Sequence, residues 1–191
     1  MKNQTLRRVV QGAMMIALAT VLSMLKFFEA PYGGSVTLGS MVPIVLFAVL
    51  YRKEPKWGVL VGLTHGVLQL LLGLNAIAGI DFISWIGAVF LDYIIAFTVL
   101  GLAGLFARKF KNLVVGSAVG SLIVCVLRFV CHFLSGILIW GAYAPEGQSA
   151  WFYSLTYNGG YMLVETIITV VLVTLLVAVL PLKKMGFDPE D

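Results

Sequence analysis

Two polar residues, Arg128 and His132, lie one helical turn apart within one of the most apolar stretches of the chain. A second long apolar stretch carries Asp92, followed directly by Tyr93. A charged side chain inside a bilayer costs about 2.5–3.5 kcal/mol on insertion scales, so sequences seldom retain one unless it lines a cavity or binds a ligand. The function of this chain should therefore be sought at these residues.

The composition of the 191-residue chain is that of a membrane protein. Hydrophobic residues make up 60% of it, charged residues 12%, and the mean hydropathy is +1.00. A typical soluble domain is about 45–50% apolar and about 25% charged. We therefore expect a single membrane domain over residues 1–191. The net charge of +4 is modest and indicates no nucleic-acid partner.

Apolar stretches of roughly transmembrane length recur along the chain and predict an all-α fold with six transmembrane helices. They cover residues 8–28, 40–52, 57–74, 82–107, 112–140 and 155–182. The second is short, which suits a steeply packed or partly interfacial segment. The first is too long for a signal peptide and is followed by no convincing cleavage site, so we expect it to be retained.

The basic residues predict the orientation of the helices. They cluster before the first helix, between the second and third, between the fourth and fifth, and after the sixth. The clusters are Lys2, Arg7 and Arg8; Arg52, Lys53 and Lys56; Arg108, Lys109 and Lys111; Lys183 and Lys184. All four fall on one side of a six-helix arrangement, and positive charge marks the cytoplasmic side. Both termini are therefore expected in the cytoplasm.

Several motif-based activities find no support in the sequence. No G-x-x-x-x-G-K-[ST], H-E-x-x-H or G-x-S-x-G motif is present, so we expect no ATPase, metalloprotease or serine hydrolase activity. Cys125 and Cys131 lack a zinc or disulfide-exchange spacing and are expected to pack as small apolar residues. His65 is expected to bond to the backbone of a neighbouring helix. We expect no metal and no cofactor.

A stripe of side chains on the predicted fifth helix suits ligand binding. Arg128, His132, Gly136 and Trp140 follow one another at four-residue intervals, and each step turns only about 40° around an α-helix. The stripe offers a fixed cation, an imidazole, a glycine at which a planar ligand could approach the backbone, and an indole face for stacking. Taken together, these groups suit a flat heteroaromatic ligand.

Two other predicted helices add polar and aromatic groups near the outer side of the membrane. The fourth contributes Asp92 and Tyr93, and the sixth begins with Tyr153 and Asn158 among further aromatic residues. Aromatic faces attract cations by about 0.5–2 kcal/mol each, and a carboxylate supplies a counter-charge. The combination favours a cationic ligand.

Simpler interpretations remain open for individual residues. Asp92 and Arg128 could form an ion pair between helices, and Trp140 could belong to an interfacial aromatic belt. Tyr157 and Tyr161 could be ordinary packing residues, and Glu165 could face a polar neighbour.

Two segments resemble the thiamine-binding membrane subunit of energy-coupling factor (ECF) transporters. They are residues 132–140, HFLSGILIW, and residues 153–159, YSLTYNG. Asp92 and Tyr93 also fall where that family carries an acidic residue and a tyrosine. The resemblance implies six helices and cytoplasmic termini. It also implies a subunit without an ATPase of its own, which works with a transmembrane coupling protein and two ATP-binding cassette ATPases.

The resemblance also implies roles for single residues. Asp92 would accept hydrogen bonds from the aminopyrimidine or balance the thiazolium charge. His132 would contact the ring system and orient the carboxylate, and Trp140 would stack on a ring. Arg128 would sit where the family has a basic residue, paired to Asp92.

Further contacts follow from the same resemblance. Tyr93, Tyr153 and Asn158 would hydrogen-bond the ligand. Ala13 and Ala17, small residues four apart on the first helix, would dock onto the coupling protein, although such pairs also occur in internal helix packing.

Three positions depart from the family pattern. Asp92 stands where glutamate is expected, residues 32–35 lack the tryptophan of some members, and Phe82 stands where a tyrosine is expected. The prediction is therefore a thiamine-capturing importer subunit in a bacterial cell membrane. Alternatives are the same architecture for another vitamin or a thiamine precursor, an intramembrane enzyme that uses Asp92, Arg128 and His132, and a proton-coupled secondary transporter.

Overall fold

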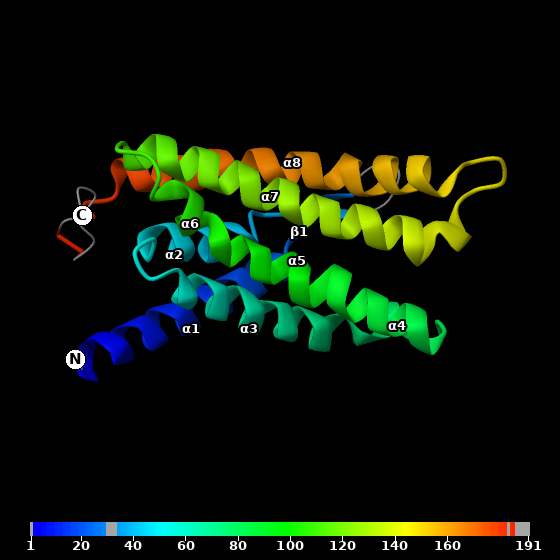
Figure 1. Ribbon diagram of the computed structural model, residues 1–191, viewed down its shortest axis with the longest axis horizontal. Coiled ribbons are helices and arrows are strands. Elements are labelled where there is room, and N and C mark those ends of the chain that lie inside the picture. The colour runs from blue at the N-terminus through cyan, green and yellow to red at the C-terminus, as the bar shows by residue number, and fades with distance from the viewer. Residues whose placement is uncertain (1, 30–33, 183, 186–191) are drawn as a thin grey trace.

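Long helices that run roughly along one axis form the body of the protein (Figure 1). The computed structural model describes residues 2–29, 34–182 and 184–185. Within these residues, five helices are long and apolar enough to cross a membrane. They are α1 (Lys2–Met24), α3 (Pro55–Gly73) with its 3-10 extension η1 (Leu74–Ile77), a composite helix over Phe82–Ala107, α7 (Leu113–Leu138) and α8 (Ala150–Val179). The predicted all-α fold is confirmed at this level.

The composite helix changes its winding along its length. It consists of α4 (Phe82–Ala88), the π-helical segment η2 (Val89–Ile94), α5 (Ile95–Thr98), the 3-10 segment η3 (Val99–Leu102) and α6 (Ala103–Ala107). Asp81 caps its first turn, because one carboxylate oxygen accepts from the backbone N–H groups of Ile83 and Ser84, each at 3.1 Å. Single π-turns inside α-helices are rare and often mark functional sites.

One further helix, α2 (Val42–Leu50), comes second along the chain and is short and buried. All nine of its residues are buried, with Ile44, Val45 and Phe47 among the most deeply enclosed. Nine residues at 1.5 Å each reach across only about half of a bilayer core. The predicted segment 40–52 is therefore a core helix, and its apolar character reflects burial in protein.

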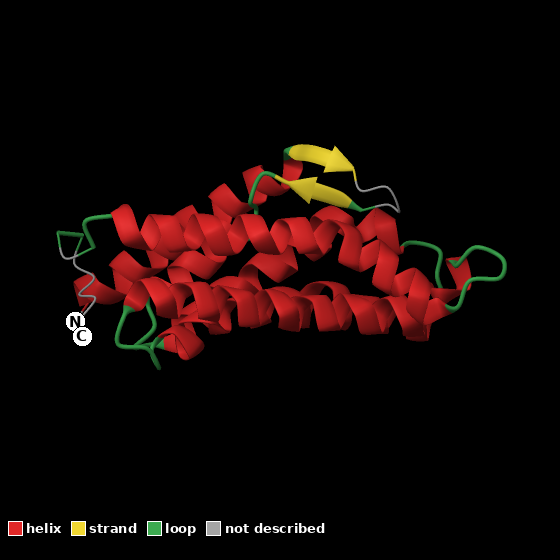
Figure 2. Cartoon of the chain, turned by 90° about the horizontal axis from the view of Figure 1, so that it is seen from above, coloured by secondary structure: helices red, strands yellow, loops and turns green. Residues whose placement is uncertain are grey.

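Glycines allow the helices to approach one another closely. A Cβ atom on Gly58 of α3 would collide with the backbone of Gly101 in η3, and a Cβ on Gly101 would collide with Gly58. The two backbones therefore meet directly at this crossing. On the other side of the molecule, α7 and α8 lie side by side over much of their length (Figures 1 and 2).

A small β-hairpin lies on one flank of the helices (Figure 2). Strand β1 (Lys26–Glu29) pairs antiparallel with β2 (Ser35–Thr37). The prediction of a helix that continues to residue 28 is wrong, because α1 ends at Met24 and the next residues form β1. Aromatic Phe27 and Phe28 favour a strand once a pairing partner is available. Residues 32 and 33, part of the segment 32–35 that departs from the family pattern, lie outside the described residues.

Candidate functional site

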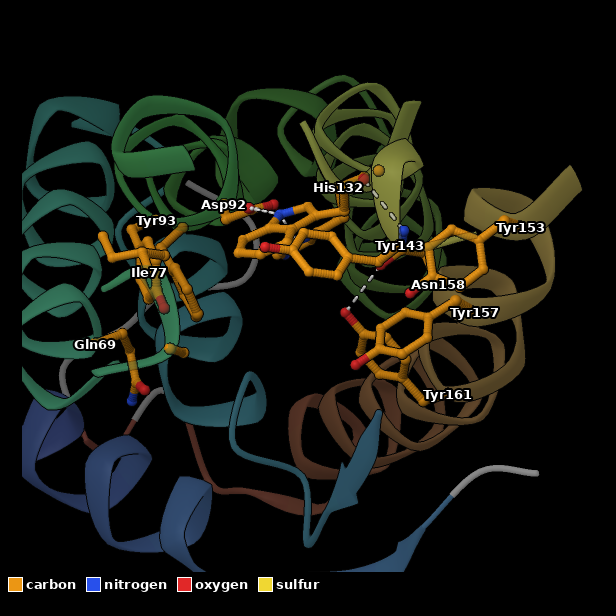
Figure 3. Close-up of a pocket in the computed structure, with 14 residues that line it drawn as sticks. Gln69, Ile77, Asp92, Tyr93, His132, Tyr143, Tyr153, Tyr157, Asn158 and Tyr161 are labelled. Carbon is orange, nitrogen blue, oxygen red and sulfur yellow. Dashed lines mark hydrogen bonds and ion pairs between the residues drawn. The ribbon is translucent and has the colours of Figure 1, made fainter. Parts of the chain in front are cut away.

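A pocket of about 480 Å³ lies between α3, the composite helix, α7 and α8 (Figure 3). Its volume suits a small organic ligand, for which pockets of roughly 300–1,000 Å³ are usual. Of the predicted binding residues, it is lined by Asp92, Tyr93, His132, Gly136, Trp140, Tyr153 and Asn158. The remaining lining residues are Gln69, Ala76, Ile77, Phe97, Tyr143, Tyr157 and Tyr161.

The carboxylate of Asp92 is held by side chains of α7 and of the segment that follows it. Its Oδ1 atom lies 3.0 Å from Nδ1 of His132, and its Oδ2 accepts from Oγ of Ser135 at 2.6 Å and from Nε1 of Trp140 at 3.0 Å. An ionised carboxylate only accepts hydrogen bonds, so His132 must donate from Nδ1. These contacts hold an acidic group in one orientation at the wall of the pocket. Asp92 belongs to the π-helical segment η2.

Asn158 connects α8 to α7 beside this carboxylate. Its Nδ2 donates to the backbone oxygen of His132 and to Oγ of Ser154, both at 3.2 Å, and its Oδ1 accepts from the hydroxyl of Tyr161 at 3.4 Å. Ser154 in turn donates to the backbone oxygen of Phe133 at 2.8 Å. The amide therefore orients the wall formed by His132 and Tyr161.

Gly136 has a packing role that the sequence did not reveal. A Cβ atom at this position would collide with Oγ of Ser154 and lie 2.9 Å from Nδ2 of Asn158. The absence of a side chain thus lets α8 approach α7 next to the pocket. The predicted approach of a planar ligand to this backbone stays a prediction.

Sequence and structure comparisons with known proteins point to the same family. Residues 9–184 match the family described as thiamine transporter protein. The thiamine transporter ThiT of Bacillus subtilis is 37% identical over 192 residues, which cover 94% of this chain and 95% of that protein.

The chain belongs to the thiamine transporter protein family.

Two further proteins support this membership. The thiamine transporter ThiT of Lacticaseibacillus paracasei is 35% identical over 151 residues, covering 74% of this chain and 72% of that one. A solved structure of ThiT from Listeria monocytogenes superposes with a TM-score of 0.74 at 25% identity and covers 93% of this chain and 97% of that chain. The predicted resemblance to thiamine transport subunits in bacterial membranes is confirmed, as is the prediction of a transport protein.

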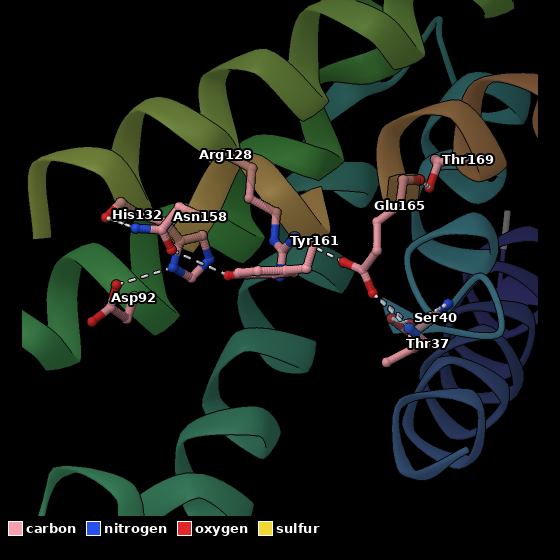
Figure 4. Close-up of polar contacts among 9 residues, drawn as sticks. All are labelled: Thr37, Ser40, Asp92, Arg128, His132, Asn158, Tyr161, Glu165 and Thr169. Atoms are coloured by element: carbon pink, nitrogen blue, oxygen red, sulfur yellow. Dashed lines mark hydrogen bonds and ion pairs between the residues drawn. The ribbon is translucent and has the colours of Figure 1, made fainter. Parts of the chain in front are cut away.

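Arg128 of this family member does not pair with Asp92, and that prediction is wrong (Figure 4). Its NH1 atom lies 3.4 Å from Oε2 of Glu165 on α8, and its guanidinium lies 5.0 Å from the ring centre of Phe97. Arg128 precedes His132 by one turn, and its charge pairs with Glu165 of α8 while its guanidinium packs over Phe97 of the composite helix. It is absent from the described residues that line the pocket.

Glu165 also bonds to the β-hairpin. Its Oε1 accepts from the backbone N–H of Thr37 at 3.0 Å and from the Thr37 hydroxyl at 2.7 Å. The hydroxyl of Thr37 also lies 2.8 Å from Oγ of Ser40, which can donate to it. The carboxylate of Glu165 therefore connects α7 and α8 to the strand β2.

The aromatic side of the pocket was only partly predicted. Ordinary packing was one open interpretation of Tyr157 and Tyr161, and both line the pocket with Tyr153. Adjacent rings of this series lie 5.8 and 6.1 Å apart. The four-residue spacing of the three tyrosines is the signal that could have found them. Ser135 was also missed, since a lone serine in an apolar helix carries no distinguishing pattern.

The remaining candidates lie away from the ligand pocket. His65 is buried, packs edge-on against Phe97 and lies 3.5 Å from Nε2 of Gln69 on its own helix. Its Nδ1 has no hydrogen-bond partner among the described residues, so the expected bond to a neighbouring backbone is not found there. Ala13 and Ala17 are exposed on α1.

Proposed function

We propose that this chain captures thiamine in the pocket beside Asp92 and acts as the substrate-binding subunit of an ATP-driven ECF importer. One observation carries the proposal: a carboxylate held by three donors faces a pocket surrounded by aromatic rings. Thiamine is a cation with two planar heteroaromatic rings joined by a methylene group, and its pyrimidine ring carries an amino group. A carboxylate and aromatic faces are the groups that attract such a ligand.

Individual roles follow from the chemistry of the lining. Asp92 accepts a hydrogen bond from the aminopyrimidine or balances the positive charge, while His132 and Trp140 border the rings. Tyr93 and Tyr153 contribute hydroxyl groups and ring faces. Asn158 presents its Oδ1 beside them. Arg128 supports the wall of the pocket through its ion pair with Glu165. This pairing keeps the positive charge of Arg128 away from a cationic ligand.

The assembly follows the resemblance stated above. In the proposed orientation all six helical segments belong to one membrane domain, and both termini face the cytoplasm. The positions of the termini agree with this, because α1 begins and α8 ends at the same end of the molecule (Figure 1). Ala13 and Ala17, which are exposed on α1, would dock onto the coupling protein. The two ATP-binding cassette ATPases of the importer would drive release of the vitamin inside.

A titration tests the capture step directly. Thiamine added to the purified protein without ATP should quench tryptophan fluorescence, because Trp140 lies in the pocket. Asp92→Asn should weaken binding about 10- to 150-fold, since a hydrogen bond to a charged group is worth about 1.5–3 kcal/mol. Asp81→Asn serves as the matched control, because Asp81 lies outside the pocket lining, and it should change the affinity less than about twofold.

Three results would contradict the proposal. The protein could respond to a different vitamin and not to thiamine, or Asp92→Asn could bind thiamine as tightly as the native protein. Thiamine uptake driven by a proton gradient without the ATPase partners would favour a secondary transporter.

A further inference from the structure

Ser135 makes the shortest of the hydrogen bonds that hold Asp92. Its side chain is fully buried on α7, and its hydroxyl lies 2.6 Å from Oδ2 of Asp92 across the helix interface. Two other buried serines of α7 and α8 donate to backbone carbonyl groups. Ser117 donates to the carbonyl oxygen of Val114 at 2.8 Å, and Ser154 donates to that of Phe133. Ser135 instead donates to the acidic side chain at the pocket wall.

The two oxygens of Asp92 are unequally occupied. A carboxylate offers about four lone-pair positions, two on each oxygen. Ser135 and Trp140 together take both positions on Oδ2, whereas His132 takes one on Oδ1. Counting contacts from the described residues, one acceptor position remains, and it belongs to Oδ1.

We propose that Ser135 is a positioning residue that makes Asp92 selective for a ligand N–H group. By occupying Oδ2 with Trp140, it holds the carboxylate so that the acceptor left for a ligand is on Oδ1. This inference rests on the proposed function, in which Asp92 contacts the ligand. The matching donor on thiamine is the amino group of the pyrimidine ring.

The geometry explains how an aspartate can serve here. Its side chain has only two torsions, and rotation about the second would exchange the two oxygens. The hydroxyl of Ser135 and the indole N–H of Trp140 lie on one oxygen, and the imidazole of His132 lies on the other. Removal of the Ser135 hydroxyl frees an acceptor position on Oδ2 and relaxes this orientation.

A double-mutant cycle tests whether Ser135 acts through Asp92. Thiamine affinity is measured for the native protein, Ser135→Ala, Asp92→Asn and the double variant, with titrations extended to millimolar ligand so that weak binding stays measurable. Ser135→Ala should weaken binding about tenfold in the native background. It should change the affinity less than about twofold when Asp92 is already asparagine.

Ser121→Ala provides the matched control. Ser121 is also fully buried on α7, and its hydroxyl has no hydrogen-bond partner within the described part of the chain. Its removal should leave thiamine affinity within about twofold of the native value. Equal effects of the two serine substitutions would overturn the proposal.

An analogue tests the selectivity. Oxythiamine carries an oxo group where thiamine carries the ring amino group, so it lacks the donor proposed to meet Oδ1. The native preference for thiamine over oxythiamine should fall about tenfold in Ser135→Ala. An unchanged preference, or a tenfold loss that persists in the Asp92→Asn background, would overturn the role of Ser135 while native thiamine binding still supports the proposed function. A native protein that ignores thiamine would refute both.

Discussion

Asp92 and Glu165 are two acidic side chains within the membrane-embedded part of the chain, and they have opposite surroundings. Glu165 is 5% exposed and meets the cation of Arg128 and the strand β2, whereas Asp92 is 14% exposed and borders the pocket. Each carboxylate has three polar contacts with described residues, and both side chains are largely buried. Neither the number of partners nor burial alone therefore separates them. The difference is that Asp92 lines the pocket, whereas Glu165 is not among the described residues that line it.

Glu165 therefore holds protein segments together. One oxygen meets Arg128 of α7, and the other accepts two hydrogen bonds from Thr37. Breaking a buried ion pair by removing one partner costs more than the pair itself contributes, because the other charge stays buried and unpaired. Within the described residues Asp92 has no arginine or lysine partner, so under the proposed function its charge is available to a cationic ligand.

Glu165→Ala should show the largest effect on stability. It leaves the guanidinium of Arg128 buried without its carboxylate, so the free energy of unfolding should fall by about 3–5 kcal/mol. Denaturant unfolding in detergent micelles measures this. Asp92→Asn is the comparison variant and should lose much less stability while it loses ligand affinity. Equal losses of stability in both variants would erase the distinction between the two sites.

Gly136→Ala tests the close contact of α7 with α8 beside the pocket. The added methyl group would collide with Ser154 and crowd Asn158, so the pocket wall must shift and thiamine affinity should fall about tenfold. Gly159→Ala is the matched control on α8. The nearest atom to its Cβ would be on Phe129 at 3.9 Å, an ordinary contact. That variant should bind normally and gain up to about 1 kcal/mol of stability from better helix propensity.

Thr37→Val should have a smaller effect confined to the Glu165 cluster. It removes the hydroxyl that donates to Glu165 but keeps the backbone N–H and the shape of the side chain. The free energy of unfolding should fall by about 1 kcal/mol. Thr64→Val is the control, because Thr64 is exposed and its hydroxyl bonds only to the carbonyl of Leu60 on its own helix. If Thr37→Val altered thiamine affinity more than Ser135→Ala, the contacts of Glu165 and those of Asp92 would not have the separate roles described above.

Asp81→Asn should have the smallest effect on stability, because Asp81 is an exposed carboxylate outside the membrane-spanning segments. Hydrogen bonds from the side chain and backbone of Ser84, and from the backbone of Ile83, hold the pKa of Asp81 below its usual range. A lowered pKa in the folded state means that the contribution to stability is present above about pH 4 and is lost as the pH falls through the folded-state pKa. The small stability advantage of the native protein over Asp81→Asn should therefore shrink on acidification, as measured by the unfolding midpoint in detergent. An advantage that grows at low pH would reverse this sign.

Much of the architecture could be predicted from apolar stretches and residue spacing. Helices have to be apolar over about 20 residues to cross a bilayer, so the five long helices were visible in the sequence. The four-residue spacing of His132, Gly136 and Trp140 predicted one face of the fifth apolar stretch. The structure places all three at the pocket. The short helix α2 was also recognised, although its apolar residues are buried in protein.

The partners of the polar residues were beyond reach. Spacing along one helix determines which side chains share a face, but it does not determine which neighbouring helix that face meets. Arg128 was therefore assigned to the wrong carboxylate, and Ser135 was not noticed at all. The hairpin strand β1 was likewise missed, because four residues acquire strand structure only when β2 pairs with them.

Hydrophobicity and residue spacing were enough to predict a helical membrane protein with a polar, aromatic helix face. Hydrophobicity and helical periodicity are local properties, and they survive in any arrangement of the helices. Tertiary structure alone decided which of two carboxylates meets the buried cation and which faces the pocket. That choice depends on how α7 packs against α8 and against the composite helix, because this packing brings together residues far apart in the chain.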